Sequence, residues 1–344
     1  MLTEKRFLDI SSRFAGRTIA VIGDFFLDRY LFFDDSQKEI SAETGLFANQ
    51  VIKIIHSPGA AGNRAVNLKA QGAGTVIPVG YTGDDGEGYE LRQDIRALGC
   101  GDDYLLTLPE RHTCFYAKPQ NKDIRGLAGE KERYDFKNRT PFTQDEEQSL
   151  TEAAEAAVLR ADGVIVADQS EVDREGCGVV TPGVRRALIS LAAKHPEKLF
   201  WVDSRLRGDR FRNMILKPNA KEAVWCALGK TEFSEEDINA AGRMLSEKNR
   251  RPVFLTLSEK GIRIFDRDRV TGVPAVRVEG ETDPTGAGDS VTAAAVLALL
   301  SGANFEEAAR TGCLAASVTV RQLGRTGSAT PEDIAKQIAA ETEI

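Results

Sequence analysis

Short apolar runs alternate with amphipathic stretches of helical length along most of this 344-residue chain. Continuous apolar runs are typical of strands that are buried on both faces, as in a parallel sheet. Their alternation with helices predicts an α/β fold in which helices cover both faces of that sheet. The predicted strands include 18–23, 162–168, 199–203 and 252–257, and the predicted helices include 145–160, 182–194, 235–248 and 305–320.

Several of these predicted strands end in an aspartate. Asp24 follows the first strand, and Asp168 and Asp203 close two later ones. Ligands of open parallel sheets bind at the carboxyl ends of the strands. We therefore expect these three carboxylates to face a binding crevice.

Two stretches interrupt the alternation. Segments 27–56 and 113–136 are rich in aromatic and β-branched residues and have little helical periodicity, which favours strands. We interpret them as a small lid outside the main sheet. The expected organisation is one domain over 1–344, with a β lid inserted at 25–57 and 110–138.

The composition excludes several classes of protein. Forty-five basic and 52 acidic residues give a net charge of −7, so the surface as a whole does not favour nucleic acid. Five widely spaced cysteines, none in a C-x-x-C pair, and only three histidines indicate neither a disulfide framework nor a zinc site. No run of about 18 apolar residues occurs. We expect a cytoplasmic protein without nucleic-acid or membrane partners.

The most informative segment is 283–290 (DPTGAGDS), which leads into the apolar stretch VTAAAVLALL. A glycine-rich turn that opens a helix presents free N–H groups to an anion, and Gly286 and Gly288 allow close approach of a phosphate. Asp289 is placed to accept the proton of a hydroxyl that attacks phosphorus. The alternative is an aspartate that caps a glycine-initiated helix; the upstream Asp283 and the apolar helix favour the phosphoryl-transfer interpretation.

Two other phosphate-binding motifs fail at named residues. Gly229, Lys230 and Thr231 look like the end of a P-loop, but that motif requires glycine where Val224 stands. Gly286-Ala287-Gly288 lacks the third glycine of a dinucleotide fingerprint.

From about Arg17 to about Pro331, the chain resembles the ribokinase, or PfkB, family of carbohydrate kinases. DPTGAGD is similar to the C-terminal signature of that family. The resemblance implies a ribokinase-like three-layer sandwich with a mostly parallel central sheet, a small β lid, and ATP and Mg²⁺ as cofactors. It also implies that Asp289 is the catalytic base and that the amides of Gly286, Ala287 and Gly288 form the anion hole.

Two N-terminal segments resemble the sugar-binding motifs of the family. GDFFLDRY (23–30) resembles the first-strand segment, which implies that Asp28, with Asp24 beside it, binds sugar hydroxyls. PGAAGN (58–63) resembles the Gly-Gly signature, which implies substrate contacts from Gly59 and Asn63. Ala60 replaces the usual second glycine of that signature.

On the nucleotide side, KPNAKE (217–222) is similar to the Asn-x-x-Glu segment, which implies that Asn219 and Glu222 organise Mg²⁺ through water. TLSEKG (256–261) looks like the loop that lines the ATP site. Cys313 stands where the family often has an asparagine near the adenine. The residues implied to bind nucleotide are Asn219, Glu222, Thr256, Ser258, Gly261 and Thr285, and Asp283 resembles a position that binds a monovalent cation such as K⁺.

Within the family, the chain looks most like the kinase domain of heptose-phosphate kinases, on the segments GDFFLDRY and RQLGRTG (321–327). The sequence predicts an ATP-dependent kinase of a sugar or sugar phosphate. Two alternatives remain: a kinase-like sugar sensor without catalysis, and a kinase of a non-sugar alcohol such as a nucleoside. Lid strands expose edges that a second lid would cover, which predicts a homodimer.

Overall fold

A nine-stranded sheet forms the centre of the protein, in a computed structural model that describes residues 2–124, 126–172, 174–324 and 326–342. Strands β7, β6, β1, β10, β11, β12 and β13 of this sheet pair in parallel, each with the next in this order. Strands β14 and β15 add an antiparallel edge. The mostly parallel sheet predicted from the sequence is therefore confirmed. The spatial order is β15 (Arg269–Val273), β14 (Ile262–Asp266), β13 (Val253–Thr256), β12 (Ile215–Leu216), β11 (Leu199–Ser204), β10 (Gly163–Asp168), β1 (Thr18–Gly23), β6 (Thr75–Thr82) and β7 (Leu105–Thr107).

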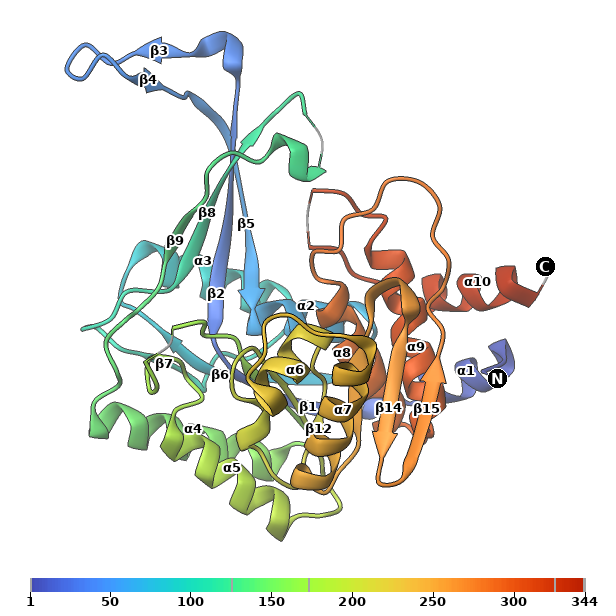
Figure 1. The fold of residues 1–344 in the computed structure, drawn as a ribbon. Coiled ribbons are helices and arrows are strands. Elements are labelled where there is room, and N and C mark those ends of the chain that lie inside the picture. Colours follow the sequence, from blue (N-terminus) through green and yellow to red (C-terminus); the bar gives the residue numbers. More distant parts are fainter. Residues whose placement is uncertain (1, 125, 173, 325, 343–344) are drawn as a thin grey trace.

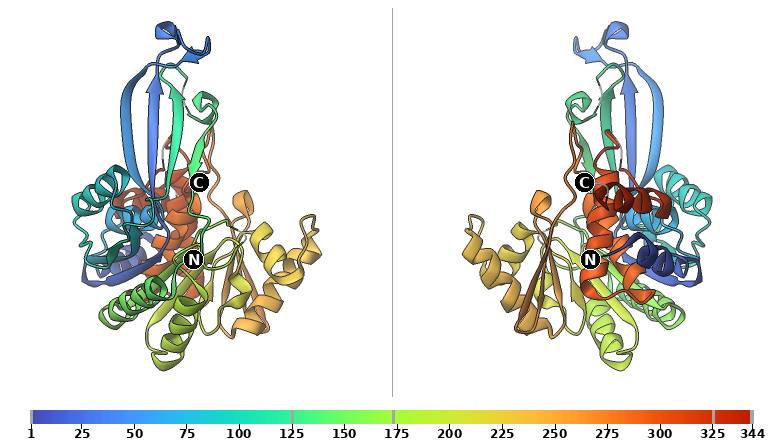
Figure 2. Two further views of the ribbon diagram at one scale, coloured as in Figure 1. Left: turned by 90° about the vertical axis from the view of Figure 1, so that its left-hand side faces the viewer. Right: turned by 90° about the vertical axis from the view of Figure 1, so that its right-hand side faces the viewer.

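Helices cover both faces of the central sheet, as its side-chain alternation requires (Figure 2). In β1, Ile19 and Val21 enter one core and Ala20 and Ile22 enter the other. The first core is closed by α1 (Glu4–Ser11), α2 (Ala61–Ala70), α3 (Gly86–Ala97), α8 (Ala287–Leu300), α9 (Phe305–Thr319) and α10 (Pro331–Thr342). The second is closed by α4 (Gln144–Arg160), α5 (Pro182–Lys194), α6 (Ala220–Leu228) and α7 (Glu235–Asn249).

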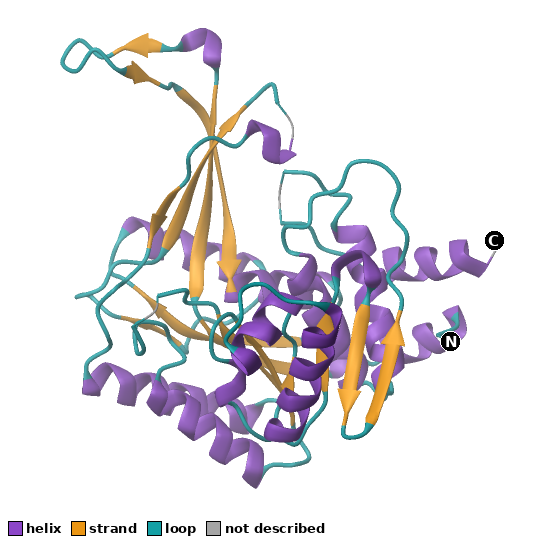
Figure 3. Ribbon diagram, in the orientation of Figure 1, coloured by secondary structure: helices purple, strands orange, loops and turns teal. Residues whose placement is uncertain are grey.

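A second sheet projects outward from the side of the domain where the central strands have their carboxyl ends (Figures 1 and 3). Its order is β5 (Val51–Ala60), β2 (Phe25–Phe33), β8 (Phe115–Asn121) and β9 (Tyr134–Phe136). Strand β2 pairs antiparallel with β5 and parallel with β8. A small hairpin of β3 (Glu39–Ile40) and β4 (Phe47–Ala48) extends from the far end. We call β2, β5, β8 and β9 the lid sheet.

Helix α8 is apolar all round because it is buried all round. Residues 290–298 are buried, and α8 packs against α2 and α9. This burial fixes the direction of the helix, so its N-terminal turn is held at the base of the lid sheet. Among the described residues, no helix is long and apolar enough to cross a membrane.

Candidate active site

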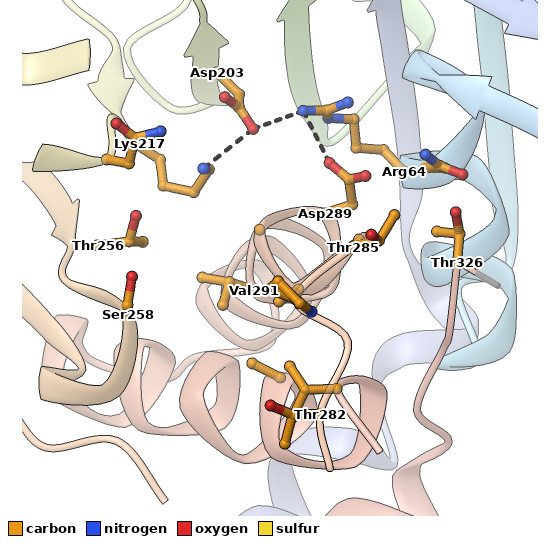
Figure 4. A pocket seen from close by; sticks show the side chains of 18 of the residues that line it. Arg64, Asp203, Lys217, Thr256, Ser258, Thr282, Thr285, Asp289, Val291 and Thr326 are labelled. Atoms are coloured by element: carbon orange, nitrogen blue, oxygen red, sulfur yellow. Dashed lines mark hydrogen bonds and ion pairs between the residues drawn. The ribbon is translucent and has the colours of Figure 1, made fainter. Parts of the chain in front are cut away.

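A cavity of about 940 Å³ lies between the lid sheet and the carboxyl ends of the central strands. It is lined by the N-terminal turn of α8, by lid residues such as Asp28 and Tyr116, and by loops that follow β11, β12 and β13. Figure 4 shows the α8 turn at the centre of this cavity, with Asp289 at its start. The cavity therefore brings together segments that are far apart in the sequence.

The N-terminal turn of α8 offers two backbone donors to the cavity. Gly286 is the N-cap, with φ at +81°, and a β-carbon there would lie 2.6 Å from Thr326 Cγ2. The amide of Ala287 donates to the carbonyl oxygen of Pro284 at 3.1 Å. Among the described residues, the amides of Gly286 and Gly288 have no such backbone acceptor. An anion at this helix end would meet these two donors and the positive end of the helix dipole.

A chain of charged side chains crosses the cavity floor (Figure 4). Lys217 Nζ lies 3.2 Å from Asp203 Oδ2, which accepts from Arg64 Nη2 at 2.7 Å. The same Arg64 nitrogen lies 3.0 Å from Asp289 Oδ1. Burial raises the pKa of the Asp289 carboxyl, and Arg64 opposes that rise. Asp203 behaves oppositely: Lys217 and Arg64 overcome its burial and lower its pKa.

On the lid side, Asp28 lines the cavity, and one of its carboxylate oxygens is unsatisfied among the described residues. Its Oδ2 pairs with Lys118 Nζ at 3.2 Å, whereas Oδ1 is buried without a hydrogen-bond partner among the described residues. Burial raises the pKa of this carboxyl, and Lys118 opposes the rise. Asn63 lines the cavity next to it. A sugar hydroxyl donating to Asp28 Oδ1 would satisfy this buried acceptor.

Two other predicted acceptor-side residues lie behind this surface. A β-carbon on Gly59 would lie 2.8 Å from Asp28 Cγ, so Gly59 makes room for that carboxylate. Asp24 does not line the cavity. Its two oxygens accept from the backbone amides of Gln169, Ser170 and Val179 at 2.7–3.0 Å.

Two of the three strand-end aspartates therefore differ from the sequence expectation. Only Asp203 lines the cavity. Asp168 is 1% exposed and accepts from Ser204 Oγ at 2.6 Å. The expectation failed because backbone amides of the chain after β10 enclose Asp24, and the hydroxyl of Ser204 at the end of β11 binds the buried Asp168.

The residues predicted to bind nucleotide gather at the other end of the cavity. Ser258 and Gly261 belong to the turn between β13 and β14, and Gly261 has φ at +91° with no room for a β-carbon beside Val273 O (2.1 Å). Cys313 of α9 lines the same region, where burial raises the pKa of its thiol to about 11. All six residues that the sequence predicts to bind nucleotide line this cavity: Asn219, Glu222, Thr256, Ser258, Gly261 and Thr285.

Asn219 and Glu222 form a capping box at the start of α6. Glu222 N donates to Asn219 Oδ1 at 2.8 Å, and Asn219 N donates to Glu222 Oε2 at 2.9 Å. Glu222 Oε1 pairs with the half-exposed Arg205 at 3.3 Å. Both Glu222 oxygens thus already have protein donors, which fits contact with Mg²⁺ through water rather than direct ligation. Within the described ranges, no group of three or more His, Cys, Asp or Glu side chains could hold a metal ion.

Asp283 lies just outside the cavity lining. It is 3% exposed, and its oxygens accept from the amides of Thr285 at 2.9 Å and Gly324 at 3.1 Å. Asp283 therefore joins the turn before α8 to the loop after α9. Arg325, part of the RQLGRTG segment, lies outside the described residues.

Sequence reasoning missed two cations of the site. Arg64 and Lys217 are 2% and 5% exposed, and both line the cavity. A charged residue among the apolar positions of 61–68 was the available signal for Arg64, because buried charges require partners.

Comparisons with solved structures agree with this fold. The ribokinase of Arabidopsis thaliana, complexed with ribose and ATP, superposes with a TM-score of 0.68 over 94% of this chain and 98% of that one, at 18% identity. Phosphofructokinase-2 from Escherichia coli, in complex with potassium, gives the same TM-score and identity over 95% and 99%. The predicted ribokinase-like fold is thus confirmed.

Sequence comparisons point the same way. The bifunctional protein HldE of Nitrobacter hamburgensis is 30% identical over 327 residues, which cover 93% of this chain and 63% of that protein. HldE of Caulobacter vibrioides is 32% identical over 319 residues, covering 90% and 61%. The chain thus spans somewhat less than two thirds of these relatives. The model of the pfkB family carbohydrate kinases matches residues 19–333, so the chain belongs to the pfkB family of carbohydrate kinases, which are phosphotransferases.

Proposed function

We propose that this protein transfers the γ-phosphoryl group of ATP to a hydroxyl of a sugar or sugar phosphate, with Asp289 as general base. One observation carries this proposal: Asp289 lies beside the amides of Gly286 and Gly288, which have no acceptor among the described residues, on the floor of a cavity that reaches Asp28 and Ser258. A base and fixed donors for the transferring group are what phosphoryl transfer requires.

The acceptor would bind at the lid end of the cavity. Asp28 Oδ1 and the Asn63 side chain would contact its hydroxyls, and Gly59 would keep the Asp28 carboxylate in place. Lys118 holds the other Asp28 oxygen, so the free one keeps a fixed direction. Heptose phosphates are the first acceptors to test, on the resemblance described above.

ATP would occupy the opposite end, along Thr256, Ser258, Gly261 and Thr285. Mg²⁺, carried on the phosphates, would neutralise their charge, with Glu222 and Asn219 contacting its water shell. Asp283, which binds the turn before α8, is the proposed neighbour of a monovalent cation. The amides of Gly286 and Gly288 would donate hydrogen bonds to the transferring group and so stabilise the negative charge that develops on it, while the Ala287 amide supports the turn.

The proton of the acceptor hydroxyl would pass to Asp289. Its carboxylate must therefore be ionised when the acceptor binds, which Arg64 favours. We propose that the inserted segments 25–57 and 110–138, which carry most of the lid sheet, form a lid that closes over the acceptor and excludes water.

We also propose that two copies pair through the lid. Strand β5 is an edge of the lid sheet and exposes Val51, Ile52, Ile54 and Ile55, and Phe47 in the neighbouring hairpin is 72% exposed. A second lid would cover both the unpaired strand edge and the apolar side chains. Ile54→Asp should convert a dimer into a monomer in light scattering. The five free cysteines suit the reducing cytoplasm that we propose as its location.

The test of the proposed kinase is ATP consumption with Mg²⁺ and K⁺ over a panel of sugars, sugar phosphates and nucleosides. One acceptor should stimulate turnover, and Asp289→Asn should lower kcat by at least about 10³-fold with ATP binding retained. A variant that keeps substantial turnover would exclude Asp289 as the base. Turnover with a nucleoside alone would identify a non-sugar kinase instead.

A further inference from the structure

Arg64 is a buried arginine in the first turns of α2, at the point where the lid sheet meets the central domain. Its side chain is 2% exposed, yet it lines the cavity. Burial of a guanidinium is costly unless carboxylates and carbonyls satisfy it. Its partners therefore indicate what the arginine does.

Arg64 binds one group from each of three separate elements. Nη1 donates to the carbonyl oxygen of Ala60 at 2.8 Å, at the end of β5. Nη2 donates to Asp203 Oδ2 at 2.7 Å, near the end of β11, and lies 3.0 Å from Asp289 Oδ1 in α8. The rigid planar guanidinium of Arg64 thus connects the end of β5, the central sheet and α8, the helix that carries Asp289.

The contact with Asp289 is made by one carboxylate oxygen: Oδ1 lies 3.0 Å from Arg64 Nη2. In the part of the chain that the structure describes, Oδ2 accepts no hydrogen bond, so Arg64 holds the carboxylate from the Oδ1 side. A carboxylate held at one oxygen cannot rotate freely, so the second oxygen keeps a constant direction. Figure 4 shows Asp289 between Arg64 and the α8 turn.

We propose that Arg64 is a positioning residue, which holds Asp289 through Oδ1 so that Oδ2 receives the proton of the acceptor hydroxyl. This inference rests on the proposed function, since it assumes that Asp289 is the base. Arg64 itself touches no reacting atom in this scheme.

The charges around Asp289 give this inference a measurable consequence. Arg64 from α2, Lys217 after β12 and Arg205 after β11 favour its ionised form, whereas Asp203 at the end of β11 opposes it. Lys217 and Arg205 have their own carboxylate partners, Asp203 and Glu222. Without Arg64, burial and Asp203 would act on Asp289 with less opposition, and the carboxylate would take up a proton at a higher pH.

The experiment compares wild-type protein with Arg64→Met and Arg64→Lys. The expected result for Arg64→Met is a fall in kcat of about 10²-fold, with KM for ATP nearly unchanged. The acid limb of the kcat–pH profile should move up by about one pH unit. Arg64→Lys, which keeps the charge without the planar fork, should return the acid limb towards the wild-type position.

Arg111→Met is the matched control. Arg111 is a buried arginine that binds Glu146 and two backbone carbonyls away from the cavity. Its removal should lower stability without moving the acid limb. An equal loss of kcat in Arg64→Met and Arg111→Met, with neither limb moved, would reduce Arg64 to a structural role. Higher kcat in Arg64→Met would show that the ion pair blocks the base.

A carbon-13 titration of the Asp289 carboxyl separates this inference from the proposed function. The signal is assigned by its loss in Asp289→Asn, and Arg64→Met should raise its midpoint. An unmoved midpoint overturns the inference even if the enzyme is an active kinase. Conversely, a protein that phosphorylates no acceptor refutes the proposed function, while a raised midpoint would still establish that Arg64 controls Asp289.

Discussion

Gly59 of β5 is a diagonal neighbour of Asp28 in the antiparallel partner strand β2, at a separation that leaves no room for a β-carbon. Such an atom on Gly59 would lie 2.8 Å from Asp28 Cγ and 2.9 Å from Oδ1. It would also lie 3.0 Å from Oδ2, so it would displace both oxygens, including Oδ1, which is buried without a hydrogen-bond partner among the described residues. The identity of residue 59 therefore sets the position of the carboxylate on the neighbouring strand.

Gly59→Ala should raise KM for the acceptor at least about tenfold, since a displaced hydrogen bond to a charged group costs about 1.5–3 kcal/mol. KM for ATP should change little, because Gly59 lies at the lid end of the cavity. Gly272→Ala is the control, since a β-carbon there meets no atom within 4 Å. Equal KM values in the two variants would refute the role of Gly59.

Ala60→Gly should stabilise the protein by about 1 kcal/mol. Ala60 has φ at +50° and ψ at −115°, a conformation that costs a non-glycine residue about 1–3 kcal/mol. Glycine removes this strain, but it also raises the conformational entropy of the unfolded chain, which offsets part of the gain in stability. Urea denaturation measures the change. Ala65→Gly, inside α2, should instead destabilise; loss of stability in both variants would contradict the strain argument.

Glu222→Gln should raise KM for MgATP about tenfold, since the lost charge holds Arg205 and would attract the water shell of Mg²⁺. The dependence of rate on Mg²⁺ concentration should shift in parallel. Glu307→Gln is a close control, because Asn304 and Glu307 form the same capping box at α9 and Glu307 also pairs with an arginine, Arg6. That variant should lose stability and keep its KM.

Asp168→Asn should change how stability depends on pH. Burial, together with the nearby Asp24, raises the pKa of Asp168 to about 6, against about 3.9 in an unfolded chain. Between these values the folded state binds more protons than the unfolded one, so its stability falls as pH rises. Above pH 6 the charged carboxylate costs roughly 3 kcal/mol.

Urea denaturation from pH 4.5 to 7.5 checks this expectation. The free energy of unfolding of Asp168→Asn should decline less with pH than that of the wild type, and the variant should gain most near neutrality. Asp123→Asn, at a largely exposed aspartate, should leave the pH dependence as it is. Parallel curves for wild type and Asp168→Asn would show that Asp168 does not titrate in this range.

The sequence alone led to the α8 turn and to Asp289, the proposed base. Gly286, Gly288 and Asp289 are neighbours in the chain, and the apolar stretch after them could only form a buried helix. Their spacing along the chain therefore fixes their relative positions without any contribution from tertiary packing. The same holds for Asn219 and Glu222, whose three-residue spacing places them in one capping box.

Positions that depend on loops were harder to infer. Asp24, Asp168 and Asp203 all lie at strand ends, yet only Asp203 lines the cavity. The loop after β10 binds Asp24, and Ser204 of β11 binds Asp168. No periodicity in the sequence encodes the path of that loop. The backbone amides of that loop donate to Asp24 because the sheet brings β1 and β10 side by side.

The sequence by itself determined the alternation of strands and helices, the family, and the glycine-rich turn before α8, because these follow from the order of residues within short segments. Only the tertiary structure decided that Arg64 meets Asp203, 139 residues away, and Asp289 in α8. That meeting depends on α2 packing beside α8 on one face of the sheet. A buried charge takes whichever partners the packing brings within reach.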